Sequence, residues 1–279
     1  MNLDVSHLFQ SLYMEGGKNF YCYNGASPLP SAMFSVKYML SSNPVDESPL
    51  RTLVGSSNGN YLYRNNYCLP LGYMMSEKAI KGWESSMLDR IGSLNSLAQQ
   101  LGAKGDMLYP ATCTQSQAAG DTTIDISEDG YYYADYVTCN ADSLTVSRDD
   151  GWTQQYGKTT HRYLLDLGEC KAGTKVHITN LNAETIEYHV YRLNFKAMCT
   201  AYETLSEQTM SLEKMTDRRI VGSIDVRQAG RLILSVPADE GWSLYVDGKK
   251  TKIKPFADAL IGVHLKEGTH KIELRYTKS

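Results

Sequence analysis

Aromatic side chains are concentrated in one part of this 279-residue sequence, between positions 131 and 156. Their flat apolar faces can stack on sugar rings, while their polar tips reach water or a ligand. In a strand, alternate side chains face opposite sides, so about half of the tyrosines in the run YYYADY must be structural. The sequence does not decide which face of that run meets solvent. The candidate glycan-binding residues are Tyr131, Tyr132, Tyr133, Tyr136, Trp152 and Tyr156.

Other residue types that perform chemistry show no comparable grouping. His161, His177 and His189 lie on neighbouring predicted strands and could form a metal site, but lone histidines in a β domain are more often ordinary polar residues. The sequence contains no Cys/His signature of a catalytic thiol and no P-loop. The paired carboxylates at 149–150 and 239–240 sit at predicted turns, where water solvates them. We therefore predict no catalytic residue, no metal ligand and no cofactor.

The composition of the sequence argues against some classes of partner and gives no sign of a membrane span or a signal peptide. The formal net charge of −3 argues against a nucleic-acid partner, because such partners favour a basic surface. No apolar run approaches the roughly 18 residues needed to cross a bilayer, and the N-terminus shows no signal-peptide pattern. The six cysteines are scattered without metal-type spacing. We interpret them as thiols, although an even number outside the cytoplasm would also allow disulfides.

Strand signals that would position the aromatic residues recur through residues 107–195. Turn residues such as Glu128-Asp129-Gly130 and Lys171-Ala172-Gly173 separate them. Short strands at this spacing predict an antiparallel β-sandwich of the jelly-roll kind. The predicted strands cover residues 122–126, 131–138, 143–147, 162–167, 175–179 and 186–195.

The last fifty residues predict a second, smaller β-sandwich, because apolar side chains alternate along several short runs. Two pairs, Asp247-Gly248 and Glu267-Gly268, supply the residues that tight hairpin turns require. Each pair predicts a hairpin, the second one joining strand 262–265 to strand 270–276. Trp242 begins one of the alternating runs, so we predict that it is a buried core residue.

The N-terminal region gives weaker signals. Two short apolar runs, 33–40 and 68–75, predict buried strands, and Asn58-Gly59 predicts a turn between them. Residues 83–101 carry an apolar stripe at helical spacing and predict a helix capped by Ser86. The whole is predicted to be mainly β, with an irregular α/β N-terminal segment (1–82), a helix plus the first sandwich (83–205) and a second, smaller sandwich (206–279).

Several sequence motifs resemble those of the YfhO family of bacterial multipass membrane proteins. The run SVPADEGWSLYVDGKK, followed by ALIGVHLKEGTHKIELRY, is similar to the closing segment of that family. Upstream, SVKYML and YLYRNNYCLPLGYMM are similar to two family strands that occur in the same order. The resemblance covers about residues 30–276. It implies that a transmembrane helix follows in the parent protein, so we expect this chain to be an excised extracytoplasmic portion.

The resemblance also implies a function that the residues alone do not. The parent protein looks like a GT-C-type glycosyltransferase, which moves sugar from a polyprenyl-phosphate carrier to cell-envelope polymers such as teichoic acids. The catalytic acid of that class lies in an early loop that this chain does not match. We therefore expect a non-catalytic domain at the extracytoplasmic face of the bacterial cell membrane, which positions an acceptor glycan beside the membrane portion of the same protein. The alternatives are a secreted carbohydrate-binding module and a purely structural or interaction domain.

Overall fold

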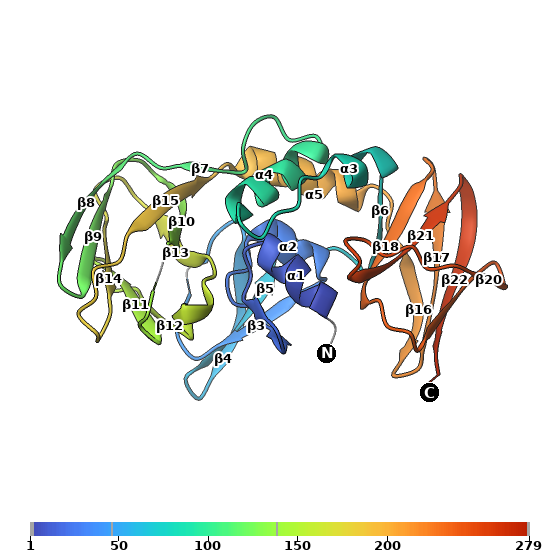
Figure 1. The fold of residues 1–279 in the computed structure, drawn as a ribbon, viewed down its shortest axis with the longest axis horizontal. Coiled ribbons are helices and arrows are strands. Elements are labelled where there is room, and N and C mark those ends of the chain that lie inside the picture. Colours follow the sequence, from blue (N-terminus) through green and yellow to red (C-terminus); the bar gives the residue numbers. More distant parts are fainter. Residues whose placement is uncertain (1–2, 46, 138, 278–279) are drawn as a thin grey trace.

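The computed structural model describes residues 3–45, 47–137 and 139–277. The chain forms antiparallel sheets with a few helices, and Figure 1 shows an elongated molecule with a sandwich at each end and the helices between them. The predicted mainly β fold with two antiparallel sandwiches is confirmed. Within the described ranges, none of the helices has the length and apolar character needed to cross a membrane.

The first sandwich packs a four-stranded sheet against a five-stranded sheet. The first sheet has the order β13-β10-β15-β7, with bounds Leu165–Cys170, Gly130–Tyr136, Tyr188–Leu193 and Leu108–Pro110. The second has the order β12-β11-β14-β9-β8, with bounds Thr153–Gly157, Ser143–Arg148, Lys175–Thr179, Asp121–Ile126 and Cys113–Ala118. Alternate side chains of both sheets, such as Ile124, Val146 and Leu165, form the buried core between them.

Most predicted strands of this sandwich have different bounds in the structure; the strand predicted at 186–195, for example, covers only Tyr188–Leu193, because helix α5 (Phe195–Ser206) follows it. Strand β13 begins at Leu165 rather than at 162, because a 3₁₀ turn over Thr159–His161 (η1) and a φ angle of 48° at Arg162 occupy the preceding residues. Strand β10 ends at Tyr136. Thr138, the predicted end of that strand, lies outside the described residues.

The second sandwich contains one strand from the N-terminal part of the chain. Its five-stranded sheet has the order β16-β17-β22-β19-β20, with bounds Ser211–Thr216, Arg219–Val226, Gly268–Tyr276, Trp242–Val246 and Lys249–Thr251. Its three-stranded sheet has the order β21-β18-β6, with bounds Leu260–Leu265, Gly230–Pro237 and Gly72–Met75. Strand β6 pairs antiparallel with β18, so residues far apart in sequence share this sheet. Of the predicted strand 68–75, only Gly72–Met75 forms a strand.

The two predicted hairpins of this sandwich have different outcomes. Asp247 and Gly248 adopt φ angles of 52° and 77° and join β19 to β20, as a type I′ turn requires. The hairpin predicted at Glu267-Gly268 is wrong, because β21 pairs with β18 whereas β22 lies between β17 and β19 in the other sheet. That turn carries the chain across the sandwich.

Trp242, which was predicted as a buried core residue, packs against the second core but is only half-buried. It is the first residue of β19, at the edge of the second core, and it packs edge-on against Tyr276 with ring centroids 5.0 Å apart. The deeply buried residue of this strand is Leu244, which is 1% exposed. The start of the strand lies too close to the end of the sandwich for its side chain to be enclosed.

Helices fill the centre of the molecule, and they outnumber the one N-terminal helix that was predicted for residues 83–101. Helices α3 (Glu77–Gly82), α4 (Arg90–Gln100) and α5 (Phe195–Ser206) lie together between the two sandwiches (Figure 1). The predicted helix 83–101 begins too early, because the Asp89 carboxylate accepts the Gly92 amide at 2.8 Å and caps α4 in place of Ser86. Trp83 instead stacks on Phe256, with ring centroids 5.3 Å apart, and ties the helices to the second sandwich.

The first thirty-odd residues are more regular than predicted. Helix α1 (Leu3–Ser11) buries Val5 and Leu8, whose spacing is helical, and strands β1 (Gly16–Gly17) and β2 (Phe20–Tyr21) follow as a small ladder. Pro28 begins the helix α2 (Pro28–Met33) at a position where proline costs no hydrogen bond. The predicted strand 33–40 is therefore wrong at its start, and strand β3 covers only Tyr38–Ser41.

A three-stranded sheet follows helix α2 in the N-terminal region. Strand β5 (Asn60–Asn65) lies between β3 and β4 (Arg51–Ser57), and the predicted turn at Asn58-Gly59 joins β4 to β5. Tyr63, on the inner face of this sheet, is 1% exposed. The sheet thus buries one side against the protein and leaves the other side open.

Candidate functional site

A cavity of about 260 Å³ lies where the three-stranded N-terminal sheet meets the first sandwich. We refer to it as the sandwich cavity. Strands β3 and β4 contribute to its wall from the N-terminal side, and β10, β12 and β13 contribute from the sandwich. The lining residues on which its chemistry depends are Tyr23, Arg51, Tyr133, Trp152, Gln154, Tyr156 and Asp166.

The alternation of β10 divides the predicted tyrosines into two sets. Tyr132 and Tyr136 point into the core of the first sandwich and are 1% and 0% exposed. Their hydroxyls donate to the carbonyls of Glu128 at 2.7 Å and Thr159 at 2.9 Å. Neither ring therefore has a face open to a ligand.

Tyr133 faces the opposite way, into the central core, and lines the sandwich cavity. Trp152 and Tyr156, two half-buried residues on or beside β12, line the same cavity. The Tyr156 hydroxyl donates to the Asp166 carbonyl at 2.5 Å, and the Trp152 ring packs on the Arg148 guanidinium, 4.7 Å from the ring centroid. The structure thus brings three of the six predicted aromatic residues around one hollow.

Tyr131 belongs to the same site without lining it. The Arg51 Nη2 atom donates to the Tyr131 hydroxyl and to Asp166 Oδ2, both at 2.9 Å, and the Tyr131 hydroxyl donates to the same Asp166 oxygen at 2.8 Å. The Arg51 and Asp166 side chains are only 13% and 23% exposed. This charge-assisted triangle joins β4 of the N-terminal sheet to β10 and β13 of the sandwich beside the cavity.

The electrostatics of the site keep Arg51 charged and the phenols neutral. Burial alone would lower the pKa of the Arg51 guanidinium, but Tyr131 and Asp166 raise it well above its ordinary value. Burial also raises the pKa of Tyr131, Tyr133 and Tyr156 well above the usual value for a phenol. At physiological pH the site therefore presents a charged guanidinium and neutral phenol hydroxyls.

Three residues that line the sandwich cavity also carry buried polar atoms without a partner. Arg51 Nε, Trp152 Nε1 and Gln154 Oε1 make no hydrogen bond to any part of the chain that the structure describes. Leaving a buried donor or acceptor unpaired costs about 1–3 kcal/mol each. Two donors and one acceptor beside aromatic rings form the complement of a polar ligand that has hydroxyl groups and flat apolar faces.

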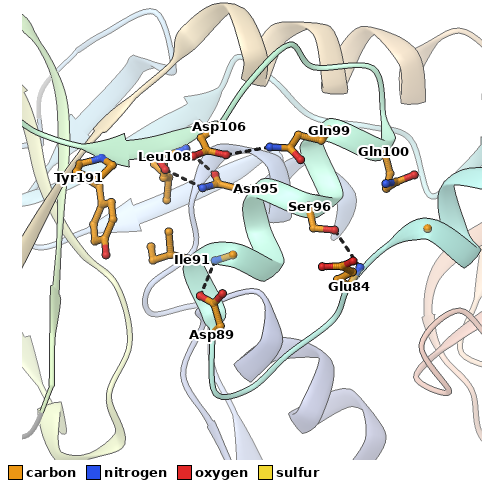
Figure 2. Close-up of a pocket in the computed structure, with 13 residues that line it drawn as sticks. Glu84, Asp89, Ile91, Asn95, Ser96, Gln99, Gln100, Asp106, Leu108 and Tyr191 are labelled. Atoms are coloured by element: carbon orange, nitrogen blue, oxygen red, sulfur yellow. Dashed lines mark hydrogen bonds between the residues drawn. The ribbon is translucent and has the colours of Figure 1, made fainter.

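A second hollow lies beside α4 and is shown in Figure 2. It measures about 430 Å³, and several of its polar side chains are bonded within the protein. Asn95 bonds the Leu108 backbone in both directions at 2.8 Å, and Gln99 donates to Asp106 at 2.9 Å. These bonds fix α4 to the strand β7, so the residues of this hollow serve the fold.

The histidines and cysteines lie apart from the sandwich cavity. Each predicted histidine has a different partner for its Nδ1 atom. His161 lies 2.6 Å from Glu15 Oε1, and His177 lies 3.0 Å from the Thr123 hydroxyl. His189 lies 3.8 Å from Asp135 Oδ2. Over the described ranges, no group of three or more potential metal ligands comes together. The six cysteines all fall within those ranges, and no disulfide joins any two of them.

Sequence reasoning missed the polar residues of the site. Arg51 carries no sequence signal, because its partner Asp166 is 115 positions away. Asp166 does carry one, since it interrupts the apolar run LLDL at a position on a predicted strand. Gln154 could have been suspected only through its place beside Trp152 and Tyr156.

Comparison with solved structures gives only distant likenesses. A conserved protein of unknown function from Pseudomonas aeruginosa is 10% identical, with a TM-score of 0.21 over 60% of this chain and 83% of that one. A β-glucosidase from Streptomyces venezuelae, solved with D-glucose, is 8% identical, with a TM-score of 0.20 over 61% of this chain and 42% of that one. Scores this low support no argument about fold or function.

Comparison with sequences is more informative. No curated protein matches this chain. The model of the family described as "Bacterial membrane protein YfhO" matches residues 1–279, which is the whole chain. A match of this extent agrees with the motifs found at both ends of the sequence, and the chain therefore belongs to the YfhO family of bacterial membrane proteins.

Proposed function

We propose that this chain is the extracytoplasmic, non-catalytic part of a YfhO-type membrane glycosyltransferase, and that its sandwich cavity holds a segment of the cell-envelope acceptor glycan or teichoic acid. The observation that carries the proposal is the set of unpaired buried atoms, Arg51 Nε, Trp152 Nε1 and Gln154 Oε1, in residues that line one cavity. Sugar hydroxyls both donate and accept hydrogen bonds, so a saccharide could satisfy all three atoms after a small side-chain adjustment.

The lining residues suit binding better than bond cleavage. Glycoside hydrolysis generally uses two carboxylates that flank the scissile bond. Among the described residues that line the sandwich cavity, Asp166 alone has a carboxylate, and Arg51 and Tyr131 already bind it. Transfer chemistry would then belong to the membrane portion of the same protein, with this part holding the acceptor.

Family membership favours this role over a secreted carbohydrate-binding module. A purely structural role is the second candidate, and the burial of Tyr132 and Tyr136 favours it, because these rings stabilise the core and leave fewer aromatic faces for a ligand. A binding measurement separates the two roles, since the structural role requires no affinity for any glycan.

The experiment is a titration of the purified chain with soluble teichoic-acid and envelope-glycan fragments, followed by NMR and by tryptophan fluorescence. We expect millimolar affinity, equivalent to about 4 kcal/mol, with changes at Trp152. Gln154→Ala should weaken binding by roughly tenfold, which corresponds to about 1.4 kcal/mol.

The matched control is Gln155→Ala, because Gln155 is the next residue of β12 and faces outward, where it is exposed. It should leave the affinity unchanged. Equal effects of both substitutions would place the glycan elsewhere on the protein. If the chain bound none of the envelope polymers, the structural role would be favoured instead.

A further inference from the structure

The outer face of the three-stranded N-terminal sheet is apolar at its centre. Residues opposite one another on antiparallel strands project to the same side, and Leu40 lies opposite Leu62 while Tyr38 lies opposite Arg64. Tyr38, Leu40 and Leu62 are 52%, 70% and 38% exposed. In Figure 1 the β4–β5 hairpin of this sheet projects from the body of the molecule. We call this surface, with the adjoining Lys37, the outer sheet face.

The side chains that alternate with these along the strands lie on the inner face of the same sheet. Tyr63 is buried, and Met39 and Arg51 line the sandwich cavity. An antiparallel sheet with one buried face usually presents polar side chains on the other. The two leucines and the tyrosine depart from that pattern: they are exposed on the outer side, and Leu40 also contributes to the lining of the sandwich cavity.

The charge of the outer sheet face is positive, although the whole chain carries a net charge of −3. Arg64 is exposed on it, and the Lys37 ammonium lies 5.4 Å from the centre of the Tyr38 ring. Its other described members on β4 and β5 are uncharged: Thr52, Gly55, Ser57 and Asn60. In the described part of the chain, neither Lys37 nor Arg64 forms an ion pair with a carboxylate.

We propose that the outer sheet face docks on the surface of an anionic lipid bilayer. Leu40 and Leu62 enter the boundary between head groups and acyl chains, Tyr38 lies at the level of the head groups, and Lys37 and Arg64 contact lipid phosphates. Leucine, tyrosine and basic residues together are the composition that binds this boundary. Basic residues near an anionic leaflet add electrostatic attraction.

Two observations favour a bilayer over a protein partner. The chain belongs to a family of membrane proteins, so a lipid surface lies close to it. Stable protein interfaces bury about 1,200–2,000 Å² in total, and the outer sheet face offers only three apolar side chains. Docking would also place the sandwich cavity near the membrane, because β3 and β4 belong to both surfaces.

The experiment measures co-sedimentation of the 279-residue chain with sucrose-loaded vesicles. One set contains phosphatidylglycerol and phosphatidylcholine in equal parts, and the other contains phosphatidylcholine alone. We expect binding to the anionic vesicles that falls as salt is added. These vesicles carry no glycan, so the result is independent of the function proposed for the sandwich cavity.

Two double variants test the residues. Leu40→Ser/Leu62→Ser should reduce binding at least tenfold, and Lys37→Ser/Arg64→Ser should reduce it by roughly tenfold and remove the preference for anionic vesicles. The control is Leu212→Ser/Met215→Ser, which alters two equally exposed apolar residues on β16 of the second sandwich. Because all these side chains are exposed, the variants should fold, and their thermal unfolding is to be checked.

An unchanged affinity of the control, together with weaker binding by the other two variants, supports the proposal. Absence of vesicle binding by the unmodified chain overturns it. Equal losses in the control and in Leu40→Ser/Leu62→Ser also overturn it, because the attachment would then be non-specific.

Discussion

The buried ion pair between Arg51 and Asp166 joins the N-terminal sheet to the first sandwich, and its removal gives a sharp test of the site. The two side chains meet at 2.9 Å and are only 13% and 23% exposed. In Asp166→Ala the guanidinium of Arg51 stays in place but loses its carboxylate. The Arg51 Nη2 atom, which bonded Asp166, then keeps only the neutral hydroxyl of Tyr131 as a partner.

Breaking a buried pair by removing one partner costs about 3–5 kcal/mol, because the other charge stays buried and uncompensated. Since both side chains retain some exposure to water, we expect about 3 kcal/mol for Asp166→Ala. Replacing both charges with apolar residues of similar volume is often nearly neutral. The double variant Arg51→Met/Asp166→Leu should therefore be more stable than Asp166→Ala.

Urea unfolding followed by circular dichroism measures these free energies. The control is Glu213→Ala, which removes the exposed pair between Lys271 and Glu213, 3.9 Å apart and 64% and 44% exposed. That substitution should cost less than about 1 kcal/mol. A cost below about 1 kcal/mol for Asp166→Ala, or a double variant less stable than the single one, would refute the argument that this pair is held away from water.

Two further predictions concern the second sandwich. Trp242→Ala should cost about 1–3 kcal/mol in urea unfolding, below the roughly 3–5 kcal/mol of a fully buried aromatic residue, because its ring is only half-buried and packs on Tyr276 at the edge of the core. A full cost of about 3–5 kcal/mol would show that the ring is enclosed. The hydrogen bond to Asp247, at 2.8 Å, raises the pKa of His270 above its usual value of 6.5, so this contribution to stability is fully present below pH 6.5 and is lost as pH rises through the raised pKa. Asp247→Asn should therefore lower stability more at pH 6 than at pH 9, and equal losses at both pH values would contradict the assignment.

Local sequence signals identified the features that depend on neighbouring residues. Asp247-Gly248 forms its hairpin because the positive φ angles of that turn suit these two residues wherever they occur. The alternating runs of both sandwiches became strands because one face of each must be buried. The grouping of Trp152 and Tyr156 was also visible, since both belong to one short stretch of chain.

Tertiary structure alone decided which strands pair and which residues form the site. Glu267-Gly268 has the residue types of a hairpin turn, yet the strands on its two sides belong to opposite sheets. Strand β21 forms its hydrogen bonds with β18, and strand β22 forms them with β17. Tyr133 faces the cavity and Tyr132 the core because both sides of β10 are covered by segments distant in sequence. Arg51 reaches Asp166 across 115 positions, and no periodicity or local propensity in a sequence encodes a contact of that range.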